Sequence, residues 1–406
     1  MRGRFGALRT VAVAGTVAAA LAASAPASAQ AAAAAGAGSS PAPIGGSQLA
    51  GRGVIVNYQP GPVPKLPGIK ASAWVIADAG TGQVLAAKNP HGWFRPASTL
   101  KVLTAISLIP VLDPDATTVA SKQATSVPPN IVGLLAGHAY KISDLFTALL
   151  TISANDAAVA LTQATGSYAR GMAAINAEAR HLQAGDTVAV TPNGLDAPGQ
   201  HTSAYDLALF GRQALTMPAF MKYDQVTSAQ FTISKKKSVG LWNQNSLLAT
   251  YPGALGGKIG WTSAAGATYV GMAKRGGHTL VVTLLHCPAL TEITAAKQLL
   301  NWGFKVDGTI SPVGTLVGPQ SPAAPSPAAS PAASRTAAAA PAASRDQAAG
   351  AGPSVLAAAG FSAMALLAAG LGFAYSRRQR PARAQAAGTD RPGPRAGNER
   401  EARRRP

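Results

Sequence analysis

One long segment of this chain cannot build a hydrophobic core: between Pro319 and Pro353 nearly every residue is alanine, proline or serine. Such a sequence buries too little apolar surface to offset the conformational entropy lost on folding, and its prolines favour an extended backbone. We therefore expect a linker over residues 309–353, and a folded domain has to lie before it. Residues 68–308 provide roughly 240 positions, enough for one domain with a substantial core.

The start of the chain has the composition of an export signal. Residues 1–29 combine three arginines with an apolar run and end in Ala27-Ser28-Ala29, the small-residue pattern of a cleavage site, so we predict a signal peptide. The alternative is that the apolar run remains as a first membrane helix. Residues 30–67 are rich in alanine, glycine, proline and serine and are predicted to be a flexible spacer.

A second apolar run, residues 354–375, has no charged residue over 22 positions and is long enough to cross a bilayer as a helix. Arginines are concentrated in the tail that follows, residues 376–406. By the positive-inside rule the tail is cytoplasmic and the preceding domain lies outside. A buried core helix is the alternative, but no foldable sequence follows the run. We therefore predict a single-pass cell-membrane protein with an extracytoplasmic domain.

The net charge of +19 is unevenly distributed. The tail after Tyr375 carries +7 and the predicted signal peptide +3, while residues 30–317 carry +8. A moderately basic exported domain suits an anionic cell wall or membrane surface, and export argues against a nucleic-acid partner. The single cysteine, Cys287, excludes an internal disulfide, and the six histidines lack zinc-site spacing. We therefore expect no metal and no other cofactor.

Within residues 68–308 the apolar pattern changes between a period of two and a helical period, which predicts a mixed α/β domain. A hairpin is expected over 72–78 and 83–88, helices over 98–109, 142–161, 205–215 and 291–302, and strands over 187–190, 255–261, 267–274 and 279–286. Thr202 is expected to cap the third of these helices and Pro218 to end it.

Two short motifs on the predicted helices have residues suited to acyl transfer. Ser98 and Lys101 lie three apart, so their side chains share one helix face. A lysine amine that is kept neutral by burial or by a neighbouring cation can accept the serine proton. Ser153 and Asn155 interrupt a helix and can face the same cleft, where Ser153 would pass a proton to a leaving amine and Asn155 would bond the substrate or Lys101. The alternatives are an ordinary surface lysine and a simple helix cap.

A third motif, Lys258 to Gly260, lies on a predicted strand. Lys258 offers a cation for a substrate carboxylate, and Gly260 leaves room for a substrate backbone to lie alongside. Thr262 adds a hydroxyl four residues after the lysine. The backbone N–H groups of Ser98 and Trp261 would form an oxyanion hole. The alternative is a glycine-rich turn that leads into an ordinary edge strand.

In order and spacing, the three motifs resemble the active-site set of serine penicillin-binding proteins and β-lactamases. Over residues 70–303 the chain resembles the D-alanyl-D-alanine carboxypeptidases. Further similar segments are 95–101, 137–157, 193–206 and 243–258. The resemblance implies a β-lactamase/transpeptidase-like fold, with a central antiparallel sheet flanked by helices, a helical subregion, and Ser98 between the two. It implies removal of the terminal D-alanine from peptidoglycan stem pentapeptides through a serine ester, with β-lactams as covalent inhibitors.

The chain departs from that family at Ile259, where threonine is usual, and at Asn193, where histidine is frequent. Isoleucine has no hydroxyl for the substrate carboxylate, so either Thr262 and backbone groups suffice or activity is altered. A D,D-endopeptidase, a β-lactamase and a non-catalytic wall-binding protein are the alternative functions. Glu178, the only glutamate between residues 30 and 290, lacks the sequence context of the deacylating glutamate in class A β-lactamases.

Overall fold

The computed structural model describes residues 43–321. The predicted signal peptide, the apolar run 354–375 and the basic tail lie outside these residues, as do parts of the predicted spacer and linker. Across residues 43–321, no helix combines the length and the apolar character needed to cross a membrane.

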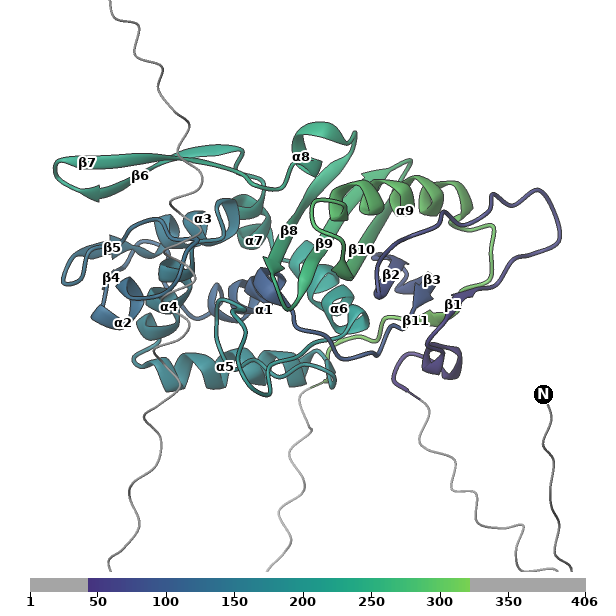
Figure 1. The fold of residues 1–406 in the computed structure, drawn as a ribbon, viewed down its shortest axis with the longest axis horizontal. Helices are drawn as coiled ribbons and strands as arrows, with labels where there is room; N and C mark the ends of the chain where they lie inside the picture. The colour runs from purple at the N-terminus through teal and green to yellow at the C-terminus, as the bar shows by residue number, and fades with distance from the viewer. Residues whose placement is uncertain (1–42, 322–406) are drawn as a thin grey trace, which may run out of the picture. The chain divides into compact units, whose positions relative to one another are not determined.

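A seven-stranded sheet forms the centre of the domain (Figure 1), in the order β1-β3-β2-β10-β9-β8, with β11 also paired to β3. Its strand pairs are antiparallel. The strands are β1 (Val54–Val56), β2 (Ala73–Asp78), β3 (Gln83–Lys88), β8 (Ala254–Thr262), β9 (Gly266–Arg275), β10 (His278–Cys287) and β11 (Gly314–Thr315). The predicted mixed fold with an antiparallel sheet is therefore confirmed.

Both faces of the sheet are buried, because successive side chains of a strand point to opposite faces and each face is covered by a helix. On β2, Val75 belongs to the core shared with α6 (Ala204–Leu215). Trp74 and Ile76 belong to the core shared with α9 (Glu292–Val306). This two-sided burial explains why β2 and β10 are apolar almost throughout.

A helical region lies beside the sheet (Figure 1). It contains α1 (Leu100–Leu108), α2 (Lys122–Thr125), α3 (Ile142–Thr151), α4 (Asn155–Ala164), α5 (Tyr168–His181) and α7 (Pro218–Asp224). Two strand pairs accompany these helices, β4 (Thr117–Val119) with β5 (Ala139–Lys141) and β6 (Ser228–Ser234) with β7 (Lys237–Trp242). Two short elements, η1 (Ser47–Ala50) and α8 (Leu247–Thr250), complete the domain. Helix α1 follows the 3-10 turn η2 (Ala97–Thr99) and is buried along its whole length, so the segment that carries Ser98 is fixed in the middle of the molecule.

The predicted hairpin, the helix break at Ser153 and the three C-terminal strands are confirmed, with differences of one to two residues at most ends. The turn between β9 and β10 is formed by Gly276 and Gly277, both with positive φ, as a tight hairpin requires. The strand predicted over 187–190 is wrong: it is reduced to one isolated bridge between Val188 and His201.

The domain extends beyond its predicted bounds of 68–308 at both ends. β1 lies inside the predicted spacer and β11 inside the predicted linker, and both pair with β3. Without them the outer edge of β3 would leave its backbone N–H and C=O groups unpaired. These strands have three and two residues, which is too short to produce a detectable apolar pattern.

The start of α6 differs from its prediction. Ser203, not Thr202, caps the helix, since its hydroxyl accepts a hydrogen bond from the backbone N–H of Asp206 at 3.1 Å. The Thr202 hydroxyl instead lies 2.9 Å from that of Thr187. Pro218 begins α7 and does not end α6, because proline is well tolerated in the first turn of a helix.

Candidate active site

A cleft of about 550 Å³ opens between the helical region and the edge strand β8. Six of the eight predicted site residues line it, namely Ser98, Ser153, Asn155, Gly260, Trp261 and Thr262. The other two, Lys101 and Lys258, are buried beside it. The structure therefore brings together segments that are about 55 and 100 residues apart in the sequence, as the motif order predicts.

The backbone around Ser98 is held tightly from two sides. Ala97 has a φ of 46°, and a side chain at Gly194 would collide with its carbonyl oxygen. On the other side, a Cβ at Gly260 would come within 2.7 Å of the Ser98 backbone nitrogen. Gly260 was predicted to leave room for a substrate; its missing side chain instead lets β8 approach the serine.

Lys101 makes the central contact of the site. Its Nζ donates hydrogen bonds to Ser98 Oγ at 2.8 Å, to Asn155 Oδ1 at 2.7 Å and to the backbone carbonyl of Asn193 at 2.7 Å. Since each acceptor is neutral, no carboxylate in direct contact stabilises the charged form of the amine. Burial therefore lowers the pKa of Lys101 well below its ordinary value, and the positive charge of Lys258 lowers it further, while the negative charge of Asp156 opposes both shifts. This direction is the one that the sequence predicted for a lysine acting as a base.

The second motif forms the opposite wall. Ser153 adopts the left-handed region, with a φ of 63°, and its buried Oγ has no hydrogen-bond partner among residues 43–321. Asn155 bonds Lys101 through Oδ1 and the carbonyl of Pro128 through Nδ2 at 2.9 Å. The N-cap of α4 is Ala154, with no side-chain capping bond, so the helix-cap alternative for Ser153 and Asn155 is wrong.

Lys258 is as buried as Lys101 but has different neighbours. Its Nζ donates to the carbonyl of Ile259 at 2.9 Å. Burial lowers the pKa of Lys258 to about 8, and the negative charge of Asp224 opposes that shift. Asp224 accepts a hydrogen bond from the Gly257 N–H at 2.7 Å, and burial raises the pKa of its carboxyl to about 7.

The remainder of β8 forms the rim of the cleft. Ile259 lines the cleft and also packs against the α9 core, so the position that usually carries threonine has an apolar side chain here. The Thr262 hydroxyl accepts the Ala265 N–H at 2.9 Å. That bond uses an acceptor lone pair and leaves the hydroxyl proton available to a ligand. Trp261 is exposed on the rim.

Three features of the site were not predicted from the sequence. Asp156, beside the second motif, accepts backbone N–H groups of residues 132–134 at 2.8 to 3.0 Å and so fixes the loop that contacts Asn155. Asn193 acts through its backbone carbonyl, which any residue type supplies, so its departure from histidine leaves the Lys101 contact intact. Glu292, in the first turn of α9, lines the cleft.

Two further observations concern a class A β-lactamase mechanism and a metal site in the cleft. Glu178 lies on α5 and is absent from the cleft lining, which removes it as the water-activating glutamate of a class A β-lactamase. In the part of the chain that the structure describes, Asp78, His278 and Asp307 are the three metal-type ligands that converge, and they lie outside the cleft. Among the described residues, neither Glu178 nor a metal-ligand cluster therefore lies in the cleft.

Comparisons with known proteins agree with this geometry. The family model of the S11 peptidases, described as D-alanyl-D-alanine carboxypeptidase, matches residues 61–288, which contain all three motifs. The D-alanyl-D-alanine carboxypeptidase DacB2 of Mycobacterium tuberculosis is 38% identical over 266 residues, which cover 64% of this chain and 91% of that protein.

Two solved structures extend the comparison to the fold. That of a D-alanyl-D-alanine carboxypeptidase from Mycobacterium tuberculosis H37Rv is similar with 37% identity and a TM-score of 0.60, covering 65% of this chain and 100% of its own. A variant of the Streptomyces K15 DD-transpeptidase has 25% identity and a TM-score of 0.56, covering 59% and 99%.

Proposed function

The chain belongs to the D-alanyl-D-alanine carboxypeptidase family of serine peptidases, and from that premise we propose that Ser98 is the nucleophile of its reaction. The observation that carries this assignment is the 2.8 Å contact between Lys101 Nζ and Ser98 Oγ, inside a cleft that the other two motifs complete. The substrate is a peptidoglycan stem peptide that ends in two D-alanines, and β-lactams acylate the same serine.

Lys101 acts as the base for the attack. In its neutral form the amine takes the Ser98 proton while Oγ bonds to the carbonyl carbon of the penultimate D-alanine. The depressed pKa of Lys101 favours the neutral amine that this step needs. The negative charge that develops on the carbonyl oxygen is stabilised by the backbone N–H groups of Ser98 and Trp261. The close approach of β8 at Gly260 supports this pairing, because it brings Trp261 beside the serine.

Ser153 completes the first half of the reaction. When the tetrahedral intermediate collapses, the C–N bond breaks and the leaving D-alanine amine needs a proton. The Ser153 Oγ is buried and lacks a partner among residues 43–321, so it is free to relay that proton from Lys101. Asn155 positions the lysine through its 2.7 Å bond. Water then hydrolyses the ester on Ser98, with Lys101 serving again as the base.

Lys258 and Thr262 bind the substrate. We assign the terminal carboxylate to the positive charge of Lys258, and the backbone of the stem peptide to the free edge of β8, where it would add as a strand. Support comes from the position of β8 at the end of the sheet, where β9 is its one strand partner among the described residues. Thr262 lies further along the same strand and offers its hydroxyl proton to the peptide.

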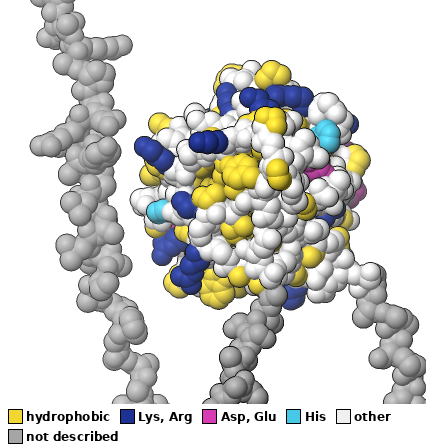
Figure 2. All heavy atoms as spheres, turned by 90° about the vertical axis from the view of Figure 1, so that its right-hand side faces the viewer, with side chains coloured by type: hydrophobic (Ala, Val, Ile, Leu, Met, Phe, Trp, Pro, Cys, Tyr) yellow, Lys and Arg dark blue, Asp and Glu magenta, His cyan; other side chains and the backbone are white. Residues whose placement is uncertain are grey.

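We further propose that the domain works outside the cell, held to the membrane by residues 354–375 after residues 1–29 are removed. Support comes from the sequence pattern of both segments, which lie outside the described residues, and from the positive charge of the domain. Figure 2 shows one face on which lysine and arginine side chains outnumber acidic ones, as an anionic wall partner would favour. Fractionation of cells that express the full chain, with protease treatment of intact cells, tests both statements.

The catalytic assignment is tested with a fluorescent penicillin and a peptide that ends in D-Ala-D-Ala. We expect the full chain to form a stable covalent adduct and to release D-alanine, and Ser98→Ala to do neither. Ser246→Ala is the matched control, because Ser246 is exposed and absent from the cleft lining. Adduct formation by Ser98→Ala would overturn the choice of nucleophile, and fast turnover of the penicillin without D-alanine release would indicate a β-lactamase.

A further inference from the structure

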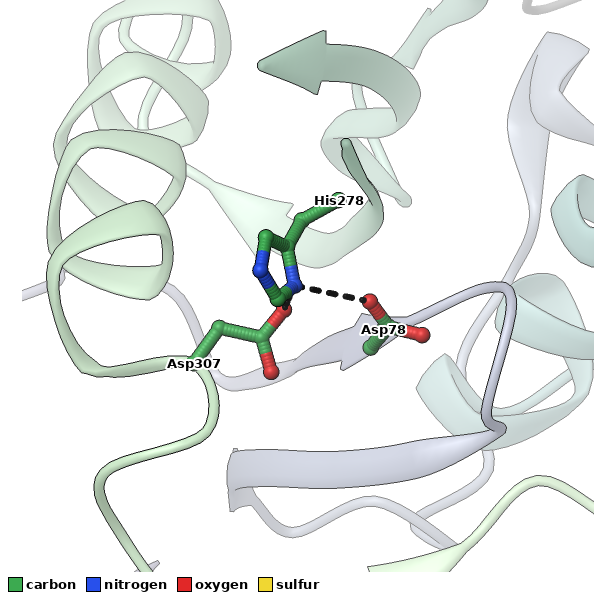
Figure 3. A group of neighbouring side chains, drawn as sticks. All are labelled: Asp78, His278 and Asp307. Atoms are coloured by element: carbon green, nitrogen blue, oxygen red, sulfur yellow. Dashed lines mark ion pairs between the residues drawn. The ribbon is translucent and has the colours of Figure 1, made fainter. Parts of the chain in front are cut away.

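Far from the cleft, three side chains of metal-ligand type converge at the other end of the sheet (Figure 3). Asp78 ends β2, His278 begins β10 and Asp307 follows α9 directly. The opposite end of β10, at Cys287, pairs with Ala267 of the cleft lining. Nine residues of strand separate His278 from Cys287, which is about 30 Å. The cluster is therefore independent of the serine chemistry.

The geometry of the cluster is close to that of a metal site. Asp307 Oδ2 lies 2.8 Å from His278 Nδ1, and Asp78 Oδ2 lies 3.8 Å from the same nitrogen. The three ligand atoms lie within 4.8 Å of one another. An ion that binds nitrogen and oxygen at about 2.0–2.2 Å holds neighbouring ligand atoms about 3 to 3.5 Å apart. Small side-chain rotations are enough to reach that arrangement, because the imidazole already lies between the two carboxylates (Figure 3).

Burial and hydrogen bonding also favour a cation beside these carboxylates. The side chains of Asp78 and Asp307 are only 6% and 5% exposed. Asp78 Oδ1 accepts the backbone N–H and the hydroxyl of Thr81, at 2.6 and 2.9 Å, which fixes the carboxylate and leaves Oδ2 facing the cluster. Asp307 Oδ2 is buried, and its one ion-pair partner within residues 43–321 is His278 Nδ1, at 2.8 Å.

No lysine or arginine of the described residues pairs with either carboxylate; their one ion-pair partner there is His278. Two nearly buried negative charges side by side are unfavourable unless a cation or a shared proton lies between them. A divalent ion balances both carboxylates and uses the imidazole as a third ligand.

We propose that Asp78, His278 and Asp307 bind one divalent transition-metal ion, for which Zn²⁺ is the best match. Mg²⁺ and Ca²⁺ prefer oxygen ligands alone, whereas an imidazole beside carboxylates favours zinc and its neighbours in the series. His278 is 51% exposed on its side chain, so the ion has an entry path and water can complete its coordination. The bound ion would fasten the C-terminal end of α9 to the ends of β2 and β10, and so stabilise the domain.

Motif spacing could not reveal this site, because its ligands are 200 and 29 residues apart in the sequence. The expectation of no metal was drawn from local histidine spacing, which detects only ligands that are close along the chain. The proposal concerns a site away from the cleft and leaves the metal-free chemistry proposed for Ser98 unchanged.

The test uses the full chain, stripped of metal with a chelator and then dialysed. We expect it to bind one Co²⁺ with a visible ligand-field absorption band, and Zn²⁺ to displace that ion. Zinc should raise the midpoint of thermal unfolding by several degrees, because it binds the folded state. Asp307→Asn and His278→Ala should each reduce the metal affinity at least tenfold, since each removes one of three ligands.

His138→Ala is the matched control, because His138 is exposed and lies outside the cluster; it should bind cobalt as the wild type does. Circular dichroism and a cooperative melt show whether each variant is folded. If Asp307→Asn fails to fold, the proposal is decided by His278→Ala, which changes a half-exposed residue, and by the wild-type titration. A wild-type chain without an absorption band at 100 µM cobalt, or variants that bind as tightly as the wild type, would overturn the proposal.

Discussion

The start of α1 and the middle of β8 each bury a lysine beside the same cleft, yet the two lysines have different surroundings. Lys101 donates to three neutral acceptors, all between 2.7 and 2.8 Å. Lys258 donates to one carbonyl, and Asp224 lies close enough for its charge to raise the lysine pKa. Burial lowers the pKa of both, but only Lys101 is lowered further by a second lysine.

The comparison shows how one cleft holds a proton acceptor and a cation at the same pH. Burial alone would push both lysines toward the neutral form. A nearby carboxylate raises the pKa of Lys258, which stands at about 8, so Lys258 is largely charged below that pH, and its charge lowers the pKa of Lys101. The role that we propose for Lys101 as base therefore depends on the cation at Lys258.

Removing the base is expected to have the largest effect. Lys101→Met fills the same space without an amine, so the rate of Ser98 acylation should fall by about 10³ to 10⁴-fold. Asn155 Oδ1 also loses its donor, and we expect stability to fall by roughly 1–3 kcal/mol. The labelling rate with fluorescent penicillin and a thermal melt measure the two effects, with the exposed Lys122→Met as control. A rate within tenfold of the wild type would mean that another group is the base.

Removing the cation tests whether Lys101 depends on Lys258. Lys258→Gln should lower kcat/KM for a D-Ala-D-Ala peptide by about 10 to 100-fold, the value of a hydrogen bond to a charged group. It also removes the positive charge that lowers the pKa of Lys101. That pKa should rise, so a higher pH is needed to keep Lys101 neutral, and the acid limb of the kcat/KM profile should move to higher pH. An acid limb that stays in place would show that the two lysines are not coupled.

The sequence predicted this pair of lysines well and their surroundings poorly. Ser98, Lys101, Ser153, Asn155 and Lys258 are chemically distinctive at fixed spacing, so a single chain suffices to find them. The Asn193 carbonyl and the Asp156 contacts were missed because they depend on how distant loops meet, which residue type does not encode. β1 and β11 were missed because strands of three and two residues carry no period. Gly260 was identified correctly as a position that needs a missing side chain, but for the wrong reason. The sequence predicted close approach of the substrate, whereas in the structure the Ser98 backbone lies against this glycine.

A smaller effect is expected at Asp224, which distinguishes the two lysine environments. Asp224→Asn keeps an acceptor for the Gly257 N–H but removes the negative charge that helps to hold the pKa of Lys258 at about 8. The Lys258 pKa should fall, so Lys258 loses its charge at a lower pH than in the wild type. The alkaline limb of the kcat/KM profile should therefore move to lower pH. At pH 6, where the raised pKa of about 7 leaves Asp224 mostly protonated, the change should be slight. Equal alkaline limbs for variant and wild type would refute the role given to Asp224.

The smallest effect is expected at Ile259, where this chain departs from its family. Ile259→Thr would place a hydroxyl on a cleft-lining position next to Lys258, and should lower KM for a D-Ala-D-Ala peptide by about three to tenfold through one added hydrogen bond. Ile259→Val is the matched control, because valine has the shape of threonine without the hydroxyl; it isolates the hydrogen bond from the loss of packing against the α9 core.

The outcome at Ile259 shows what β8 contributes to carboxylate binding beyond the charge of Lys258. If threonine improves binding and valine does not, the carboxylate lies against residue 259 and the native enzyme binds it with Lys258 alone at that end of the cleft. If both variants match the wild type, the carboxylate contact lies elsewhere on β8. Thr262→Val then identifies the donor, since the proton of that hydroxyl is the one available further along the strand.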